Sequence, residues 1–293
     1  MFKRPTAALA TLALSLGSLV AAQAAPQEGV VEVNGARIAY KSQGQGPAML
    51  LIHGFPLNGE FFKNNRSELS KSFRVITIDL RGFGRSTAPD GNGSVQTYAQ
   101  DALAVMDRLG VQKAVIGGMS MGGPILFEMY RRAPERFNGM VLIATTANPP
   151  SITEQNLWKG VGLQAQANGV PSIVPDLIKD MLTGRTQQAR PDLKAFLENL
   201  MRGASLNGVL GGSAALANRP DSLPTLRTIR VPTLIIAGGE DTVYPVVFSQ
   251  KMQQNIPNAQ LVVVPGAAHA VNIENAAAAN AAILQWATRN RLR

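Results

Sequence analysis

The chain of 293 residues contains no cysteine and only two histidines, and these scarcities exclude several kinds of site. Without cysteine there can be no disulfide, no thiolate nucleophile and no metal bound by sulfur. His53 and His269 are too few for a metal centre built from several histidines. The fold must therefore be stabilised by its hydrophobic core, for which the chain is long enough.

Charged residues are also sparse, at 16% of the chain, although basic residues outnumber acidic ones and give a net charge of +9. The lysines and arginines are scattered, and no basic run is interleaved with aromatic residues. This pattern favours a solvated basic surface over a nucleic-acid interface, and we expect no nucleic-acid partner. A mild attraction to anionic surfaces or substrates is left open.

Residues 1–24 have the order of a bacterial-type signal peptide. A basic head, Met1 to Arg4, precedes an apolar run from Ala7 to Ala22, and Ala22-Gln23-Ala24 offers a cleavage site. The alternative is an uncleaved membrane anchor, but the run is short for a spanning helix and Gly17-Ser18 interrupts it. We therefore expect cleavage, no stable membrane insertion afterwards, and a periplasmic or secreted protein.

Apolar strands alternate with helical stretches through most of the remaining chain. A turn signal at Asn34-Gly35 joins the first two extended segments into a hairpin. Strands that are apolar throughout and alternate with helices predict a mostly parallel sheet covered on both faces. The expected strands are 30–33, 37–41, 48–52, 75–78, 111–117, 140–143, 233–237 and 261–264. The expected helices are 97–109, opened by a capping box of Thr97 and Gln100, and 124–132, 246–254 and 274–288.

The alternation stops between residues 147 and 225, where helical patches, glycines and prolines occur without a convincing strand. Because the sheet needs strands from both sides of this stretch, we interpret it as a helical cap inserted into one core. The expected organisation is a signal peptide (1–24), a first part of the core (25–146), the cap (147–225) and a second part of the core (226–293). Helical spacing favours core over pocket positions for the apolar cap residues Leu157, Trp158, Met181, Leu182, Phe196 and Met201.

A glycine-rich turn between a predicted strand and a predicted helix holds the clearest chemical signal. Gly118-Met119-Ser120-Met121-Gly122 matches G-x-S-x-G, whose glycines are needed because side chains would collide across so tight a turn. Such a turn strains the backbone of the central serine, and the helix behind it adds a positive dipole end. Ser120 is therefore the candidate nucleophile, with a loop that merely packs closely as the alternative.

A serine nucleophile needs a base, and the two histidines differ in their positions. His53 ends an early strand in a His-Gly turn, which favours a structural role. His269 follows the last strand, at the carboxyl ends of the strands, where the active sites of such sheets lie. The chain order of nucleophile, acid and histidine selects His269 and leaves Glu240 and Asp241, just after a strand, as candidate acids.

Two backbone amides are candidates for an oxyanion hole. One belongs to Met121, the residue after the nucleophile, and the other to Phe55, in the loop after the strand at 48–52. The aromatic ring of Phe55 is also expected to line the pocket, with ordinary packing as the alternative.

Together these motifs resemble the α/β-hydrolase superfamily across essentially the whole chain after residue 24. The likeness is greatest to the group of small carboxylesterases, enol-lactonases and cofactor-free haloperoxidases. It implies an α/β-hydrolase fold, with a mostly parallel central sheet, helices on both faces and a helical cap. The segments that carry the resemblance are His53 to Pro56, Asp79 to Ser86, Gly118 to Gly123, Arg219 to Ser222, Ile229 to Pro232 and Gly239 to Asp241.

The resemblance also implies roles for single residues. Its register selects Asp241 rather than Glu240 as the acid that orients His269. It makes Asp79 and Arg81 an ion-paired structural turn and not catalysts. Haloalkane dehalogenases and epoxide hydrolases of this fold have aspartate at the nucleophile position, so a serine there implies acyl transfer from an ester or lactone, without a metal or organic cofactor. With hydrogen peroxide in place of water, the same site would make peracids.

Two other functions are open at this point. A lyase of the same fold, such as a hydroxynitrile lyase, would use the same side chains to abstract a proton without forming an acyl-enzyme. A ligand-binding protein would keep the three side chains and lack turnover, although their complete set argues against a degenerate site.

Overall fold

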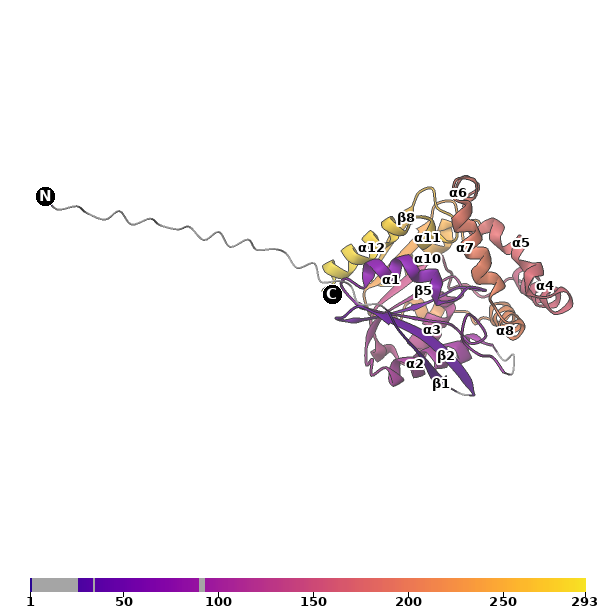
Figure 1. The fold of residues 1–293 in the computed structure, drawn as a ribbon, viewed down its shortest axis with the longest axis horizontal. Coiled ribbons are helices and arrows are strands. Elements are labelled where there is room, and N and C mark those ends of the chain that lie inside the picture. The colour runs from indigo at the N-terminus through magenta and orange to yellow at the C-terminus, as the bar shows by residue number, and fades with distance from the viewer. Residues whose placement is uncertain (2–25, 34, 90–92) are drawn as a thin grey trace.

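The computed structural model describes residues 1, 26–33, 35–89 and 93–293, so the predicted signal peptide, apart from Met1, lies outside the described residues. The described part contains one eight-stranded sheet with the strand order β1-β2-β4-β3-β5-β6-β7-β8 (Figure 1). Its strands are β1 (Gln27–Val33), β2 (Ala36–Gln43), β3 (Ala48–Ile52), β4 (Arg74–Ile78), β5 (Ala114–Met119), β6 (Phe137–Ile143), β7 (Thr233–Gly238) and β8 (Ala259–Val264).

The sheet is parallel except at one edge. The hairpin of β1 and β2 is antiparallel, with Val33 opposite Ala36, and β2 also runs antiparallel to β4. Every pairing from β4 through β3, β5, β6 and β7 to β8 is parallel. This confirms the expected fold class, and it places the ends of β3, β5, β7 and β8 along the same edge of the sheet.

Helices cover both faces of the sheet, and each face has its own hydrophobic core (Figure 1). One core packs α2, α3 and α10 through residues such as Tyr98, Phe127 and Met252. The other packs α1 and α12 through Leu69 and Trp286. These helices, with the short α11, are α1 (Lys63–Leu69), α2 (Val95–Arg108), α3 (Gly122–Arg132), α10 (Val246–Asn255), α11 (Val271–Glu274) and α12 (Ala276–Arg289). Two 3₁₀ turns complete the core, η1 (Gly59–Phe62) and η2 (Pro134–Arg136).

Between β6 and β7 the chain is helical, as expected for residues 147–225, and these helices gather at one end of the molecule (Figure 1). Ser151 caps the long α4 by accepting from the Glu154 amide at 3.1 Å. The limits of the cap as a unit stay a prediction. Its elements are α4 (Ile152–Asn168), η3 (Val170–Ile173), α5 (Val174–Leu177), η4 (Ile178–Asp180), α6 (Gly184–Ala189), α7 (Pro191–Arg202), α8 (Leu206–Ala217) and α9 (Leu223–Leu226).

The predicted starts of one helix and one strand are wrong, in both cases because a local hydrogen bond outweighs the sequence pattern from which the start was predicted. The capping box of Thr97 and Gln100 does not open α2, because the Ser94 side chain accepts from the Thr97 amide at 3.0 Å and starts the helix at Val95. The strand predicted from Val111 begins only at Ala114, because the Val111 amide donates to the last turn of α2.

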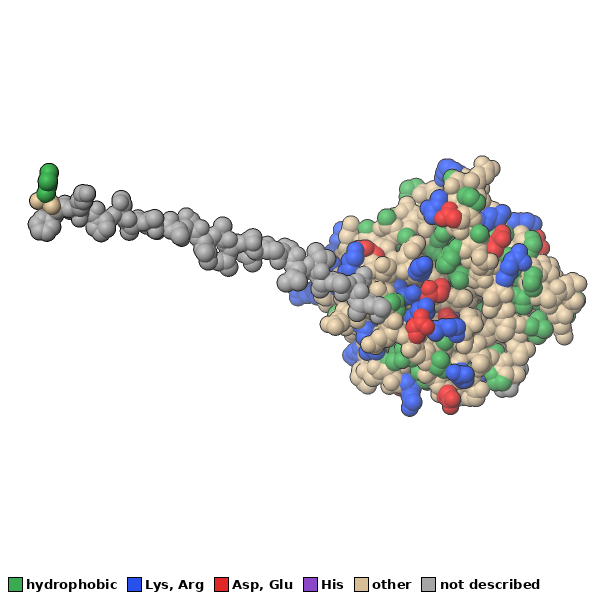
Figure 2. Space-filling view, in the orientation of Figure 1, with side chains coloured by type: hydrophobic (Ala, Val, Ile, Leu, Met, Phe, Trp, Pro, Cys, Tyr) green, Lys and Arg blue, Asp and Glu red, His purple; other side chains and the backbone are tan. Residues whose placement is uncertain are grey.

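On the face shown in Figure 2, lysine and arginine side chains are spread among polar and apolar ones and are interspersed with acidic side chains. No helix in the described ranges is both long enough and apolar enough to span a membrane.

Candidate active site

Ser120 lies in the turn between β5 and α3, in a left-handed backbone conformation with φ of 52°. Such a conformation costs a non-glycine residue on the order of 1–3 kcal/mol and persists only where its surroundings hold it. The Ser120 amide donates to the Ile143 carbonyl at 3.0 Å. The Ser120 carbonyl accepts from the Gly123 amide at 2.9 Å and from Thr145 Oγ1 at 2.7 Å. The serine is therefore held at the tip of the turn that G-x-S-x-G predicts.

The glycines around Ser120 are required by backbone contacts. A Cβ atom on Gly118 would lie 2.5 Å from the carbonyl oxygen of Gly122, and one on Gly122 would lie 2.5 Å from that of Ile52. A Cβ atom on Gly54 would lie 2.9 Å from the Cβ atom of Ser120, so the loop after β3 passes directly beside the serine.

Ser120, His269 and Asp241 form one hydrogen-bonded chain. His269 Nε2 lies 2.9 Å from Ser120 Oγ, and His269 Nδ1 lies 3.0 Å from Asp241 Oδ2. Because a carboxylate only accepts, Nδ1 carries the hydrogen and Nε2 is left to accept from the serine hydroxyl. Ser120, His269 and Asp241 follow β5, β8 and β7, respectively, so the strand ends bring together side chains that lie up to 149 positions apart in the sequence.

The carboxylate of Asp241 is fully buried and fixed on both oxygens. Its Oδ1 atom accepts from the amides of Val243 and Tyr244, each at 2.9 Å, while Oδ2 contacts His269. Glu240 is exposed and lies 3.5 Å from the guanidinium of Arg185. The structure therefore brings Asp241 and not Glu240 to the histidine.

The two predicted oxyanion donors lie on either side of the serine. The Met121 amide is at the start of α3, and the Phe55 amide follows Gly54, which packs against Ser120. Neither amide donates a hydrogen bond to another residue in the described ranges. Both are therefore free to bind a substrate oxygen.

The other residues singled out near the site are structural. His53 is fully buried, its Nε2 accepts from the Leu80 amide at 2.9 Å, and burial lowers its pKa to about 4. Asp79 accepts from two backbone amides, whereas Arg81 forms a buried ion pair with Asp101 at 2.8 Å. Both residues of the expected ion-paired turn have a charged partner, since Asp79 also lies 3.9 Å from the guanidinium of Arg85.

A cavity of about 770 Å³ opens onto Ser120 and His269 and is roofed by the cap. Phe55 lines it, as expected. Of the six apolar cap residues expected to favour the core, Met181, Leu182 and Met201 are buried in it, Trp158 and Phe196 pack against a core, and Leu157 is exposed. Leu157, Trp158, Met181 and Met201 also line the cavity. Leu182 and Phe196 do not.

Two contacts of the site were not apparent from the sequence. The Tyr244 ring packs edge-on against the His269 ring with centroids 5.7 Å apart, and burial raises the Tyr244 pKa to about 12. Glu274 accepts from the Ala268 amide at 2.7 Å and from the Thr183 amide at 2.9 Å, so it links the histidine loop to the cap. Neither residue belongs to a local motif that could have identified it.

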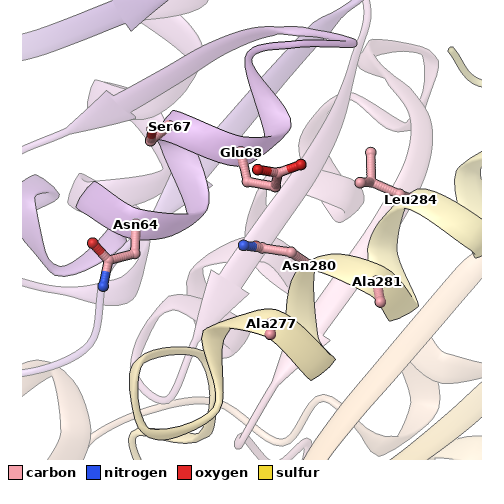
Figure 3. Close-up of a pocket in the computed structure, with 7 residues that line it drawn as sticks. All are labelled: Asn64, Ser67, Glu68, Ala277, Asn280, Ala281 and Leu284. Atoms are coloured by element: carbon pink, nitrogen blue, oxygen red, sulfur yellow. The ribbon is translucent and has the colours of Figure 1, made fainter.

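A second hollow lies between α1 and α12, away from Ser120 (Figure 3). It is lined by Asn64, Ser67 and Glu68 of α1 and by Ala277, Asn280, Ala281 and Leu284 of α12. Ser120, His269 and Asp241 do not line it. Within the described ranges, no group of three or more His, Asp or Glu side chains is placed to hold a metal ion.

Comparison with known proteins agrees with this geometry. Residues 47–276 match the family described as the alpha/beta hydrolase fold. A solved thermophilic esterase from Thermogutta terrifontis is 31% identical, with a TM-score of 0.86, over 91% of this chain and 99% of that one. The enol-lactonase from Burkholderia xenovorans LB400 is 25% identical, with a TM-score of 0.84, over 89% and 100% of the two chains. A non-heme haloperoxidase of Rhodococcus erythropolis is 28% identical over 88% of this chain and 98% of its own. The chain therefore belongs to the α/β-hydrolase fold family.

Proposed function

We propose that the chain is an exported serine hydrolase that cleaves carboxylic esters or lactones through an acyl-enzyme on Ser120. Within its family it is a hydrolase of esters or lactones, or a haloperoxidase-like relative of these enzymes. The observation that supports the mechanism best is the continuous hydrogen-bonded chain from Ser120 Oγ through His269 to Asp241, at the floor of a cavity.

In the first half-reaction, Ser120 Oγ attacks the carbonyl carbon while His269 Nε2, 2.9 Å away, takes the hydroxyl proton. Asp241 stabilises the resulting imidazolium through Nδ1 and is not itself protonated. The amides of Phe55 and Met121 bind the oxyanion, and each such donor is worth about 3 kcal/mol in transition-state stabilisation. His269 then protonates the leaving alcohol.

In the second half-reaction, water attacks the acyl-enzyme with His269 as its base, and the acid is released with Ser120 restored. Hydrogen peroxide in place of water would give a peracid, as a side activity. This scheme involves only side chains and amides of the chain itself.

The test is hydrolysis of p-nitrophenyl esters, from acetate to laurate, by the purified protein and by Ser120→Ala. We expect turnover by the wild type and a loss of about a million-fold in kcat in the variant, with folding intact. Wild-type activity in Ser120→Ala would refute the acyl-enzyme. A folded protein that turns over no ester or lactone would point instead to a lyase or to a ligand-binding protein.

Export is proposed from the order of residues 1–24, namely a basic head, an apolar run and Ala22-Gln23-Ala24. The intact mass of the protein recovered from the periplasm or medium should correspond to a chain that starts at Ala25. A full-length chain recovered only with membranes would favour the uncleaved anchor.

A further inference from the structure

Acidic side chains line the cavity above Ser120, and no lysine or arginine of the described ranges does. Among the residues that line it, all in the described ranges, Glu154, Asp176 and Asp180 are acidic, and none is lysine or arginine. This contrasts with the net charge of +9 for the whole chain.

We propose that this cavity rejects substrates that carry a carboxylate and takes uncharged or amine-bearing esters and lactones. The inference rests on the proposed function, since it names the substrate class of the same site.

The cations that pair with these acids stand outside the cavity. Arg219 Nη2 lies 2.7 Å from Glu154 Oε2, and the Arg219 side chain is only 1% exposed and is not part of the wall. Lys179 Nζ lies 2.7 Å from Asp176 Oδ1 in a pair that is about two-thirds exposed on both sides, where water screens the attraction. Neither cation lines the cavity.

Asp180 lies beside the catalytic loop and contacts no basic side chain that the structure shows. Its Oδ1 atom accepts from the hydroxyl of Thr242 at 2.9 Å, and Thr242 directly follows Asp241 in the sequence. Both Asp180 and Thr242 line the cavity. The negative charge therefore stands next to the loop that orients the histidine.

A substrate carboxylate entering this cavity would lose water and find no cation to replace it. Burial of an unpaired carboxylate is strongly unfavourable. Asp180 adds repulsion, whereas the charges of Glu154 and Asp176 are each offset by a paired cation. An ammonium group would instead meet those carboxylates and the aromatic rings of Phe55, Trp158 and Phe248. The same field would help to expel the carboxylate product of hydrolysis.

The attraction to anionic substrates that the basic composition leaves open therefore does not extend to the cavity. Net charge describes the outer surface of the protein, whereas selectivity depends on the few side chains that face the bound substrate.

The test compares three p-nitrophenyl esters of matched length. One is the half-ester of adipic acid, one has a branched alkyl end in place of the free carboxylate, and one ends in a trimethylammonium group. We expect kcat/KM for the half-ester to lie at least about tenfold below both other esters. Asp180→Asn should narrow the ratio between the cationic and anionic esters by about threefold.

Asp192→Asn is the matched control, because Asp192 forms an exposed ion pair with Arg190 at 2.9 Å on the cap but does not line the cavity. This variant changes the net charge equally and should leave the ratio unchanged. A kcat/KM for the half-ester within about twofold of that for the neutral ester would overturn the inference. So would an Asp180→Asn variant in which kcat/KM falls equally for the anionic and the cationic ester. Absence of Ser120-dependent turnover with all three esters would overturn the proposed function instead, so the two failures are distinguishable.

Discussion

Replacing Glu274 by alanine should slow hydrolysis strongly, although Glu274 does not line the cavity. Its carboxylate accepts from the amide of Ala268 at 2.7 Å and from the amide and hydroxyl of Thr183 at 2.9 and 2.6 Å. Ala268 directly precedes His269, and Thr183 lies in the cap. One carboxylate therefore fixes the loop of the proposed base against the roof of the cavity.

The expected size of the effect follows from these contacts. A hydrogen bond to a charged group contributes about 1.5–3 kcal/mol when it is buried. Glu274 is only partly buried, so water replaces some of what is lost, and we take about 2 kcal/mol for the ordering of the loop. If this stabilisation of about 2 kcal/mol no longer holds His269 in place, the activation barrier rises by about the same amount. We therefore expect kcat to fall by about 30-fold, with KM nearly unchanged. Glu274→Gln keeps one acceptor oxygen, so in this variant kcat should fall by only about threefold to tenfold.

The assay is steady-state hydrolysis of p-nitrophenyl butyrate, with thermal unfolding measured on the same preparations. Glu240→Ala is the control, because Glu240 is an exposed acid of the neighbouring loop and makes only a long contact with Arg185, at 3.5 Å. A folded Glu274→Ala protein with kcat within about twofold of wild type would refute the positioning role. A rise in KM at unchanged kcat would show instead that Glu274 acts on the cap alone.

Three further predictions address the site and its support. Asp241→Asn should lower kcat by about 10⁴-fold, because an amide facing His269 Nδ1 favours the wrong tautomer, whereas Glu240→Gln should change the steady-state rate by less than about twofold. Gly118→Ala should lower the free energy of unfolding in urea by about 2 kcal/mol or more, since its Cβ atom meets the backbone of Gly122. Burial lowers the pKa of His53 from 6.5 to about 4. The imidazole of His53 is therefore protonated less readily in the folded chain than in the unfolded chain. The contribution of neutral His53 to stability is complete above pH 6.5 and is lost as the pH falls toward 4. The free energy of unfolding in urea should therefore fall by about 2 kcal/mol between pH 7 and pH 5. The His53→Asn variant should not show this decrease.

The features that the sequence predicts well are those set within a few residues. The apolar run at 48–52 becomes β3 with the predicted bounds, because its side chains are buried on both faces of a parallel sheet. The turn around Ser120 is predicted because its glycines are dictated by contacts within the turn and with Ile52, and not by distant packing. His269 follows from its place after β8, whereas the place after β7 leaves Glu240 and Asp241 open and the family resemblance selects Asp241.

Contacts between distant segments are the features that the sequence does not predict. Arg81 pairs with Asp101 on the next helix, and no pattern in either segment distinguishes that acid from Asp79. Glu274 and Thr183 stand 91 positions apart, and their contact depends on how the cap settles on the core. Such pairings are decided by packing geometry, which periodicity does not encode.

The catalytic side chains and the cavity lining come from different parts of the fold. Serine, base and acid are placed by turns at the ends of strands, which bring Ser120 and Asp241 within 3.0 Å of His269. The acidic side chains around the substrate come from the cap, where Glu154, Asp176 and Asp180 line the cavity and Arg219 and Lys179 do not. Substitution of an acid that lines the cavity can therefore change which substrates are accepted, whereas loss of the contact between Thr183 and Glu274 should also disturb His269. For this reason the reaction type can be inferred from local motifs, whereas substrate charge has to be read from the packed cavity and is misjudged from composition.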